Sequence, residues 1–572
     1  MLLPSPHPSA AAARACRHTA RLFPSCSRRI RAPQNRFSQL LSPRPLAPCR
    51  TMMGSAASPS STITPRSYED AVRSLNGTQT NAALLEILRK AGKFMNLRSI
   101  PEMRQFVERL GYKVSDLDRL NAIHVAGTKG KGSTSAICEA VLRRLKVAGA
   151  DGKQRALKTG LFTSPHLIEV RERIRINGEP IAKDLFAKYF FEVWDALERT
   201  KPADTNPETG MPEKPQYFRY LTLMAFHAFM REGVDVVLLE VGMGGAYDAT
   251  NVIERPVVCG ITSLGFDHVP LLGHTLADIA WHKAGVMKPG IPAYTVQQPD
   301  ETIPVLHERA VELKASSLTT ISSAAVEDLG HRNFGMPGAF QKVNGALAIA
   351  LCREWVAQRR KAGVEIFGEE DAFRLGLETA NWPGRAQTYT SAQYPTVTWY
   401  LDGAHTKESM QVCADWFLDE YKALDQKTRS AGEQILLFNC TKGRDGLVLL
   451  KALSELHVST VPFSRVVFCT NDAYQPGTTD GPIDQVNHTV RRDDHLTVQK
   501  ELAAAWETLV AEQPNGPQGF AHIDIQPSIQ DALQSIAAYS MEKGVQARVL
   551  VTGSLYLIGG LLTVLQGPEH KE

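Results

Sequence analysis

The sequence has 572 residues, of which 43% are hydrophobic and 22% are charged, a composition typical of folded globular proteins. Its 42 Gly and 33 Pro are dispersed along the chain, which excludes collagen-like and low-complexity classes. The formal net charge is +4, but residues 1–68 hold ten Arg with no Lys and no acidic residue, which leaves 54 basic and 60 acidic side chains in the rest. The body of the chain therefore lacks the basic excess of a general nucleic-acid binder.

Residues 1–66 form a basic leader rich in Arg, Ser and Ala. This composition, without the uncharged apolar core of a secretory signal, predicts a mitochondrial or chloroplast presequence; the alternative is a disordered basic arm. Met52 and Met53 follow the main Arg cluster, so a chain started at either would lack most of the signal. We therefore expect a mitochondrial form and, from the later start, a cytoplasmic form.

Cysteine usage and hydropathy bear on the compartment and on membrane insertion. Six Cys residues are scattered over residues 138–469 without a C-x-x-C pair, which argues against a disulfide scaffold or a zinc ribbon. The longest uncharged stretch, residues 549–568, contains Thr, Ser and paired Gly. We expect a buried strand there that turns at Gly into a helix, and no transmembrane segment.

From about residue 67 the chain alternates apolar β-branched runs with helical patterns, which indicates βαβ units and a parallel sheet. The first set comprises a strand at residues 122–126, a helix at 133–145, a buried helix at 217–230 and a buried strand at 234–241. The second set comprises strands at residues 397–401, 434–439, 465–469 and 548–552. The boundary is expected at residues 382–385 (WPGR), and the polar stretches 361–371 and 472–495 are expected to be loops.

The Gly-rich segment 127–134 (GTKGKGST) joins the first strand to a helix, where backbone N–H groups can converge on phosphate oxygens. Gly130, Lys131, Gly132 and Ser133 are the expected ATP-binding residues, with the Lys131 ammonium on the phosphates. The strict pattern G-x-x-x-x-G-K-[ST] fails twice, because Val125 stands at its first Gly and Gly132 follows the Lys. The strand–turn–helix context still favours nucleotide binding over a purely structural turn.

A second Gly-rich element, residues 239–245 (LEVGMGG), places an acid at the end of the buried strand. The carboxyl end of a parallel strand lies at the sheet edge where ligands of such sheets bind, so Glu240 is expected beside the phosphate loop. Its carboxylate is a candidate Mg²⁺ ligand; the alternative is a Glu that caps the following turn.

Further motifs follow in order along the chain: LFTSPHLIEVRERIRING, LLEVGMGGAYDATN, ITSLGFDHVPLLGHTLADIAWHKAGVMKPG, GMPGAFQKVNGALAIA, WPGR, YLDGAHT and VTGSLYLIGG. Together with HVAGTKGKGST they resemble the folylpolyglutamate synthase family of the ATP-dependent Mur ligase superfamily, over residues 67–565. The resemblance implies an α/β fold in two domains. A P-loop-type N-terminal ATPase domain with a parallel-rich sheet would span residues 67–385, and a smaller Rossmann-like ligase domain would span residues 386–572.

The resemblance also implies a reaction that joins glutamate to the γ-carboxylate of a folate's glutamate tail. Because a carboxylate is a poor acyl donor, ATP would first convert it to an acyl phosphate, and ADP and phosphate would be released. ATP, glutamate and a folate are thus the expected small-molecule partners. We expect a monomer that binds no nucleic acid.

By similarity, Ser164, Glu240 and His268 are expected to ligate one Mg²⁺. Lys283 matches the lysine that the family carbamylates with CO₂, which would turn a cation into an anion able to hold a second Mg²⁺. From the residues alone, Ser164 is a turn residue, His268 a satisfied polar group and Lys283 a solvated helix lysine.

The resemblance places Asn344 on adenine, Arg385 on the ATP phosphates, and Asp402 and His405 on the nucleotide and the incoming glutamate. Lys131, Lys283 and His405 are the expected catalytic residues. A helix-start cap at Asn344 and a surface ion pair at Arg385 are the alternatives. The chain departs from the family at Gly403, where members often carry Val.

Two other functions remain open at this point. Dihydrofolate synthase uses the same ATP chemistry on dihydropteroate, and the ATP and metal motifs do not separate the two activities. A nucleotide-gated binding protein without ligase activity is a further alternative, although such a protein would not need Lys283, Asp402 or His405.

Overall fold

The computed structural model describes residues 66–79, 97–149, 151–205, 210–330, 333–441, 444–475, 483–485, 495–513 and 521–567. Residues 1–65 of the predicted leader, Met52 and Met53 among them, lie outside these residues. Residues 64–572 form one compact unit, and the description below concerns this unit.

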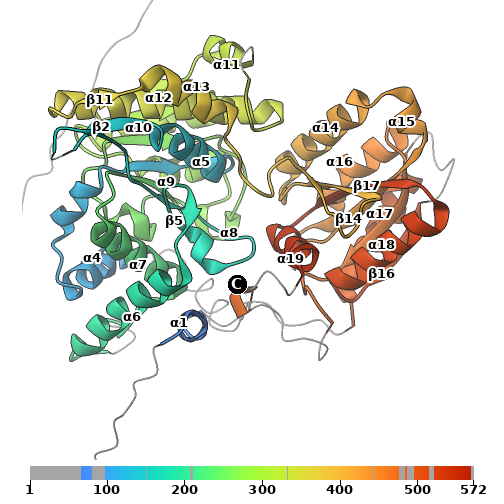
Figure 1. The fold of residues 1–572 in the computed structure, drawn as a ribbon, viewed down its shortest axis with the longest axis horizontal. Coiled ribbons are helices and arrows are strands. Elements are labelled where there is room, and N and C mark those ends of the chain that lie inside the picture. The colour runs from blue at the N-terminus through green and yellow to red at the C-terminus, as the bar shows by residue number, and fades with distance from the viewer. Residues whose placement is uncertain are drawn as a thin grey trace, which may run out of the picture. The chain divides into compact units, whose positions relative to one another are not determined.

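The first half of the unit, coloured blue to yellow in Figure 1, is built on a sheet of eight strands. Their order in the sheet is β10-β9-β8-β1-β7-β4-β5-β6. The strands from β10 to β4 pair in parallel, and β5 and β6 continue the sheet in antiparallel orientation. Their bounds are β1 (Ile123–Ala126), β4 (Thr159–Phe162), β5 (Ile174–Ile176), β6 (Glu179–Pro180), β7 (Val236–Glu240), β8 (Val258–Ile261), β9 (Pro292–Thr295) and β10 (Ser317–Thr320).

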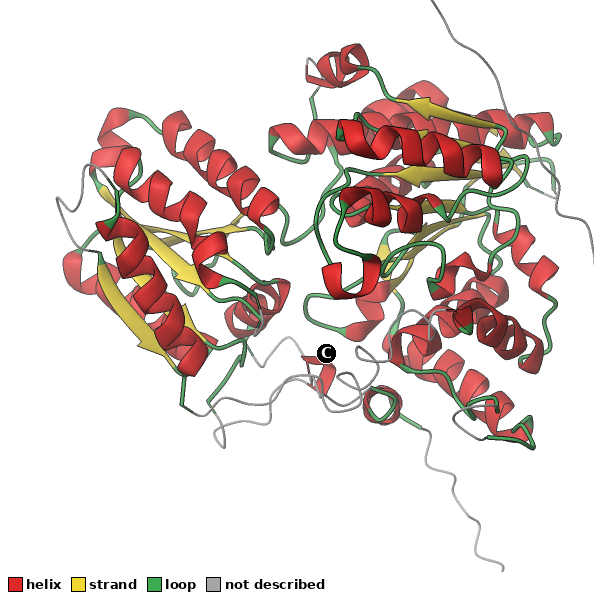
Figure 2. Ribbon diagram, turned by 180° about the vertical axis from the view of Figure 1, so that it is seen from behind, coloured by secondary structure: helices red, strands yellow, loops and turns green. Residues whose placement is uncertain are grey.

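Helices cover both faces of this sheet (Figures 1 and 2). The α-helices are α1 (Tyr68–Asn76), α4 (Ser99–Arg109), α5 (Lys131–Leu142), α6 (Lys183–Arg199), α7 (Tyr217–Glu232), α8 (Val269–Leu272), α9 (Leu276–Ala284), α10 (Ile303–Glu312), α11 (Ser323–Gly330), α12 (Ala339–Lys361) and α13 (Glu369–Glu378). Short 3₁₀ helices are η1 (Val114–Leu120), η2 (Val170–Arg173), η3 (Ala249–Val252) and η4 (Asp300–Thr302).

Strand β7 shows how the sheet is buried on both faces. Val236 and Leu238 pack with α5, α12 and α13, whereas Val237 and Leu239 point the other way and pack with α4, α6 and α7. All five β7 residues are buried. The continuous apolar run of this strand therefore has a partner on each face, as its sequence predicts.

The second half contains a sheet of six strands in the order β12-β13-β17-β14-β15-β16, in which every pair except β12–β13 is parallel. The strands are β12 (Gln387–Thr390), β13 (Val397–Leu401), β14 (Gly432–Phe438), β15 (Phe463–Cys469), β16 (His522–Gln526) and β17 (Gln546–Thr552). The helices are α14 (Lys407–Ala423), α15 (Gln426–Ser430), α16 (Gly446–Ser459), α17 (Thr497–Ala511), α18 (Ile529–Lys543), α19 (Leu555–Gln566) and the 3₁₀ helix η5 (Ile483–Gln485). Apolar clusters fill both faces: α14, α16 and α17 on one, α18 and α19 on the other.

The α/β class with parallel-rich sheets is confirmed, and so are the four predicted strands of the second sheet, with small differences at their ends. The uncharged C-terminal stretch is β17, a turn at Gly553 with φ 100°, and α19, as expected. In the part of the chain that the structure describes, no helix is long and apolar enough to span a membrane. The six Cys residues of the body are buried and unpaired.

Two predictions were wrong in detail. The helix after the phosphate loop begins at Lys131 rather than Ser133, because Gly130 adopts a φ of 91° and completes the turn before it. The helix ends at Leu142 rather than Leu145. Residues 361–371 are not a loop: α12 runs to Lys361, and β11 (Ile366–Phe367) and the start of α13 follow. β11 pairs with β2 (Lys146–Ala148), which itself pairs with β3 (Gln154–Ala156), so tertiary pairing orders this polar segment.

Candidate active site

The phosphate loop lies between β1 and the N-terminus of α5. Its backbone is fixed by hydrogen bonds from the N–H groups of Thr128 and Lys129 to the carbonyl of Ser263, at 3.0 and 3.1 Å. A helix N-terminus carries free N–H groups and a partial positive charge, which suit a phosphate. The Lys131 ammonium lies over the loop, 3.4 Å from the Thr128 carbonyl oxygen, and lines a large cavity.

The two glycines of this loop let other predicted residues approach it closely. A Cβ on Gly130 would lie 2.1 Å from Asn344 Oδ1, and a Cβ on Gly132 would lie 3.5 Å from Glu240 Oε2. Asn344 sits inside α12 rather than at its start, so the capping alternative is wrong. The structure thus brings Asn344 and Glu240 directly against the phosphate loop.

Glu240 ends β7 at the carboxyl edge of the sheet, next to β1, as predicted. Its side chain is buried, and its Oε2 accepts a hydrogen bond of 3.0 Å from the Ser164 N–H. Burial raises the pKa of Glu240, and the charges of Lys131, Arg385 and Arg173 oppose that rise. A carboxylate held among cations remains available to a metal ion.

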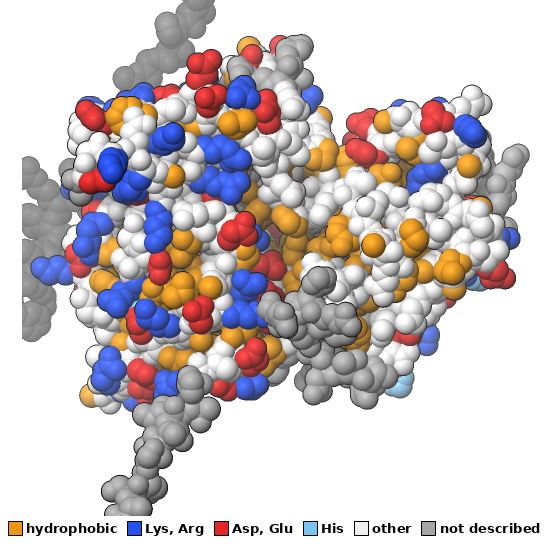
Figure 3. Space-filling model, in the orientation of Figure 1, with side chains coloured by type: hydrophobic (Ala, Val, Ile, Leu, Met, Phe, Trp, Pro, Cys, Tyr) orange, Lys and Arg blue, Asp and Glu red, His pale blue; other side chains and the backbone are white. Residues whose placement is uncertain are grey.

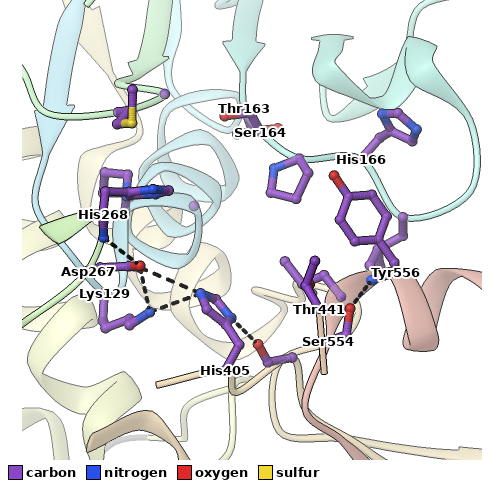
Figure 4. A pocket seen from close by; sticks show the side chains of 18 of the residues that line it. Lys129, Thr163, Ser164, His166, Asp267, His268, His405, Thr441, Ser554 and Tyr556 are labelled. Atoms are coloured by element: carbon purple, nitrogen blue, oxygen red, sulfur yellow. Dashed lines mark hydrogen bonds and ion pairs between the residues drawn. The ribbon is translucent and has the colours of Figure 1, made fainter. Parts of the chain in front are cut away.

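His268 precedes α8 with a left-handed backbone (φ 53°), and its imidazole lines the same cavity (Figure 4). Burial lowers the pKa of His268 to about 4, helped by nearby lysines and opposed by Asp267. The ring is therefore neutral at pH 7, the form that can ligate a metal. Among the described residues, no group of three or more His, Cys, Asp or Glu side chains is arranged to hold a metal ion.

Lys283 is buried in α9 with an exposed fraction of only 2%, so the solvated-lysine alternative is wrong. It lies behind the glycine loop that follows β7: a Cβ on Gly245 would lie 2.9 Å from the Lys283 carbonyl oxygen. Burial, together with the charge of Lys131, lowers the pKa of Lys283 well below its usual value. Gly245 and His282, which adjoin Lys283, line the cavity, but Lys283 itself does not.

Three predicted residues come from the second half of the chain. Asp402 follows β13, and its two carboxylate oxygens accept hydrogen bonds from the N–H groups of Ala386 and Ala404, at 2.8 and 2.9 Å. Arg385 lies beside it and lines the cavity, so it is not a surface ion pair. His405 donates from Nδ1 to the Gly403 carbonyl at 2.7 Å, which leaves the Nε2 lone pair directed elsewhere.

At the cavity, charged residues that follow strands of the first sheet contact residues that follow strands of the second. The sequence analysis did not identify this cluster. The Lys129 ammonium donates to Asp267 Oδ2 and to His405 Nε2, both at 3.0 Å (Figure 4). Arg444 donates to the His405 carbonyl at 2.6 Å. Lys129 and Asp267 lie just beyond the paired parallel strands β1 and β8, so their proximity was open to prediction. Arg444 lies in a loop that carries no comparable signal.

The cavity has a volume of about 1480 Å³ and is lined by residues from both halves of the chain. The predicted residues on its wall are Gly130, Lys131, Gly132, Ser133, Ser164, Glu240, His268, Asn344, Arg385, Asp402 and His405. On the face seen in Figure 3, Lys and Arg side chains are interspersed with Asp and Glu over the larger half, and hydrophobic side chains gather along the hollow between the halves. The fold and the cavity define an α/β protein of the nucleotide-binding class, with a phosphate loop that faces residues of a second sheet.

Comparison with known proteins defines the family. No family model matches the sequence. The chain is 42% identical over 532 residues to the folylpolyglutamate synthase of Neurospora crassa, covering 90% of this chain and 93% of that protein. It is 38% identical over 566 residues to the mitochondrial folylpolyglutamate synthase of Homo sapiens, covering 87% of this chain and 92% of that protein. The chain belongs to the folylpolyglutamate synthase family.

The fold agrees with a solved member of that family. The structure of Mycobacterium tuberculosis folylpolyglutamate synthase complexed with ADP and AMPPCP superposes with a TM-score of 0.60 at 24% identity. The match covers 85% of this chain and 98% of that chain. The likeness extends over both sheets and therefore concerns the whole fold.

Proposed function

We propose that the protein is an ATP-dependent ligase that adds L-glutamate to the γ-carboxylate of tetrahydrofolate and its polyglutamates, with release of ADP and phosphate. The observation that carries this proposal is a single cavity in which the phosphate loop and Glu240 face Arg385, Asp402 and His405. The names of the relatives, folylpolyglutamate synthases, support this activity. We further propose that residues 67–385 and 386–572 are the two domains, one around each large sheet.

ATP would bind with its phosphates at the N-terminus of α5, where Gly130, Gly132 and Ser133 supply N–H groups and Lys131 a charge. Asn344 would hydrogen-bond adenine, since it abuts Gly130 at the other side of the loop. Asp402, at the end of β13, and Arg385, at the boundary between the two proposed domains, would also contact the nucleotide. The relative from Mycobacterium tuberculosis, which was solved with ADP and AMPPCP, supports nucleotide binding at this fold.

A Mg²⁺ ion fits the residues beside the loop. Glu240 offers a buried carboxylate, Ser164 a hydroxyl and His268 a neutral imidazole. Mg²⁺ usually combines one or two such protein ligands with waters and phosphate oxygens, which is consistent with the lack of a larger protein cluster among the described residues. Bound there, Mg²⁺ would neutralise the charge that develops on the phosphates.

Lys283 would be carbamylated. Its amine nitrogen would form a bond to the carbon of CO₂ and release one proton, giving an anionic carbamate. This reaction requires a neutral amine, and burial, which lowers the pKa of Lys283 well below its usual value, favours that form. The charges of Lys131 and Lys129, which lower that pKa, would then stabilise the anion.

The reaction would proceed in two steps. An oxygen of the folate γ-carboxylate attacks the γ-phosphorus of ATP and ADP leaves, so that the carboxylate becomes an acyl phosphate. The amine of glutamate then attacks the acyl carbon, loses a proton, and phosphate leaves. His405 would hold this amine through the lone pair on Nε2. Its Nδ1–H donates to the Gly403 carbonyl, so Nε2 is an acceptor, and in the structure it accepts from Lys129.

We also propose a mitochondrial form targeted by the leader, which the mitochondrial relatives of Homo sapiens and Bos taurus support, and a cytoplasmic form started at Met52 or Met53. Tagged products started at each position would separate the two forms. Only the product of the first start should enter mitochondria.

The activity itself is tested by substrate dependence of ADP release. Residues 53–572 would be incubated with ATP and Mg²⁺, and with tetrahydrofolate, dihydropteroate and glutamate singly and in pairs. The proposal predicts ADP only when tetrahydrofolate and glutamate are both present. ADP release with dihydropteroate and glutamate alone would assign dihydrofolate synthase activity instead, and release without either acceptor would indicate a simple ATPase.

A further inference from the structure

Arg173 presents an unpartnered guanidinium to the cavity. It ends η2, its exposed fraction is only 8%, and it lines the cavity wall. Its Nε donates to His166 Nδ1 at 2.9 Å, and its guanidinium lies over the Tyr217 ring at 5.5 Å. Within the described parts of the chain, its two terminal amino groups have no hydrogen bond and no ion pair. A buried cation with free donors is a binding group for an anion.

The orientation of Arg173 is fixed through His166. The His166 Nε2–H donates to the Asp484 carbonyl at 3.0 Å, so Nδ1 carries the lone pair that accepts from Arg173. Asp484 is itself held, because its Oδ1 accepts from the Tyr68 hydroxyl at 2.6 Å and the Val170 N–H at 2.8 Å.

Arg173 adjoins the reacting end of the site. The Thr163 N–H donates to the Arg173 carbonyl at 3.1 Å, and the next N–H, that of Ser164, donates to Glu240. Figure 4 shows Thr163, Ser164 and His166 along one stretch of the cavity wall. Arg173 is also among the charges that act on the Glu240 carboxyl. Arg173 and Glu240 therefore lie on the wall of the same cavity and are joined through the Thr163–Ser164 backbone.

We infer that Arg173 binds a substrate carboxylate, and specifically the α-carboxylate of the terminal glutamate of the folate. This inference rests on the proposed function. The terminal glutamate carries two carboxylates, and only the γ-carboxylate receives the phosphoryl group. The α-carboxylate is separated from it by a short aliphatic stem and enters a cavity where an unpaired anion is costly. The Arg173 fork, held by His166, provides two parallel donors for it.

The chemistry of Arg173 would fit a carboxylate of the incoming glutamate as well. The folate is favoured because Arg173 lies on the first sheet's side of the cavity, beside Thr163 and Ser164, whereas His405 and Asp402 stand on the other side. In this arrangement Arg173 selects acceptors that already carry a glutamyl group. Dihydropteroate, whose single carboxylate is the reacting one, leaves the guanidinium unpaired.

The test is a cycle of one side-chain change and one substrate change. Wild type and Arg173→Gln are assayed with tetrahydrofolate and with an analogue whose terminal glutamate is replaced by 4-aminobutyrate, which keeps the γ-carboxylate and lacks the α-carboxylate. For wild type, kcat/KM should fall about 10- to 100-fold on passing to the analogue, as expected for a charge-assisted pair. For Arg173→Gln, the two acceptors should be used equally, with KM for ATP and glutamate unchanged.

Arg171→Gln is the matched control, because Arg171 lies in the same η2 turn but pairs with Glu169 away from the cavity. Arg171→Gln should keep the wild-type preference for tetrahydrofolate over the analogue. His166→Ala should raise KM for tetrahydrofolate, and His166→Asn, which restores an acceptor, should recover part of it.

Three results for Arg173→Gln would overturn the inference. The variant could still prefer tetrahydrofolate to the analogue as strongly as wild type does, or only its KM for glutamate could rise. In the third result, its kcat/KM would fall equally for ATP, glutamate and the folate. If wild type adds no glutamate to tetrahydrofolate, the proposed function fails instead. The two failures are therefore distinguishable.

Discussion

Gly403 occupies a position where any side chain would collide with the site. A Cβ there would lie 2.3 Å from Leu555 Cδ2 and 2.4 Å from Arg385 Nη1. The side chains of Leu555 and Arg385 thus occupy the space that a side chain at position 403 would need. We predict that Gly403→Ala displaces Arg385, raises KM for ATP about 10-fold and destabilises the fold by about 1–3 kcal/mol.

Steady-state kinetics and thermal unfolding measure these two effects. The double variant Gly403→Ala, Leu555→Ala removes one of the two collisions, so it should recover stability but not the affinity for ATP. An unchanged KM in Gly403→Ala would mean that Arg385 does not contact the nucleotide from its present position.

The carbamate of Lys283 is also a prediction about one residue. In ¹³CO₂-equilibrated buffer, wild type should show a carbamate carbon signal by NMR, and Lys283→Arg should show none, because a guanidinium does not react. Removal of CO₂ should lower kcat at least 10-fold in wild type. Lys288→Arg is the control, since Lys288 is another lysine of depressed pKa that donates to the Asn251 carbonyl. A signal that survives in Lys283→Arg contradicts the assignment.

At the scale of elements, the strand ends were the predictable part of the site. Glu240 and Asp402 end apolar parallel strands, and the edge at which they lie follows from that fact alone. The Lys129–His405 contact was not predictable, because it joins residues 276 positions apart through the placement of two sheets. The same holds for Asp484. Its polar surroundings in the sequence indicate a loop, whereas its carboxylate accepts a hydrogen bond from the Tyr68 hydroxyl, 416 positions away.

Strand β1 carries a buried histidine that makes stability depend on pH. His124 Nε2 hydrogen-bonds the Thr250 hydroxyl at 2.9 Å, and that hydroxyl donates to Asp248 at 2.6 Å. Burial lowers the pKa of His124 from 6.5 to about 3. Between these values the unfolded chain binds the proton and the folded chain does not, so stability is present above pH 6.5 and is lost as the pH falls.

We predict that His124→Gln, which keeps a polar group near Nε2 but cannot be protonated, removes this dependence. Between pH 6 and 4 the free energy of unfolding should vary less steeply, by about 1.4 kcal/mol per pH unit. Denaturant unfolding at several pH values measures the slope. The control is His307→Gln, at an exposed position on α10, which should leave the slope unchanged. An unchanged slope in His124→Gln would contradict the prediction, because it would mean that folding does not change the protonation of His124.

At the scale of the whole molecule, the Lys129–Asp267–His405–Arg444 cluster couples the two halves at the cavity. Burial lowers the pKa of Lys129 to about 8, although Asp267 opposes the change. As the pH rises through 8, the ammonium loses one of its three N–H protons and with it the positive charge that pairs with Asp267. We predict that kcat/KM falls with an apparent pKa of about 8, and that Lys129→Arg moves this alkaline limb upward by at least about 1 unit. An alkaline limb that does not move would assign the titration to another group.

The central claim is that ATP activates the γ-carboxylate of a folate for attack by glutamate, and an oxygen label tests it most directly. Tetrahydrofolate carrying ¹⁸O in its γ-carboxylate would be incubated with the protein, ATP, Mg²⁺ and glutamate, and both products analysed by mass spectrometry. The account predicts a folate heavier by one glutamyl unit, and phosphate that contains one ¹⁸O atom from the carboxylate. Phosphate without ¹⁸O, or ADP formed without a glutamyl gain on the folate, would contradict it.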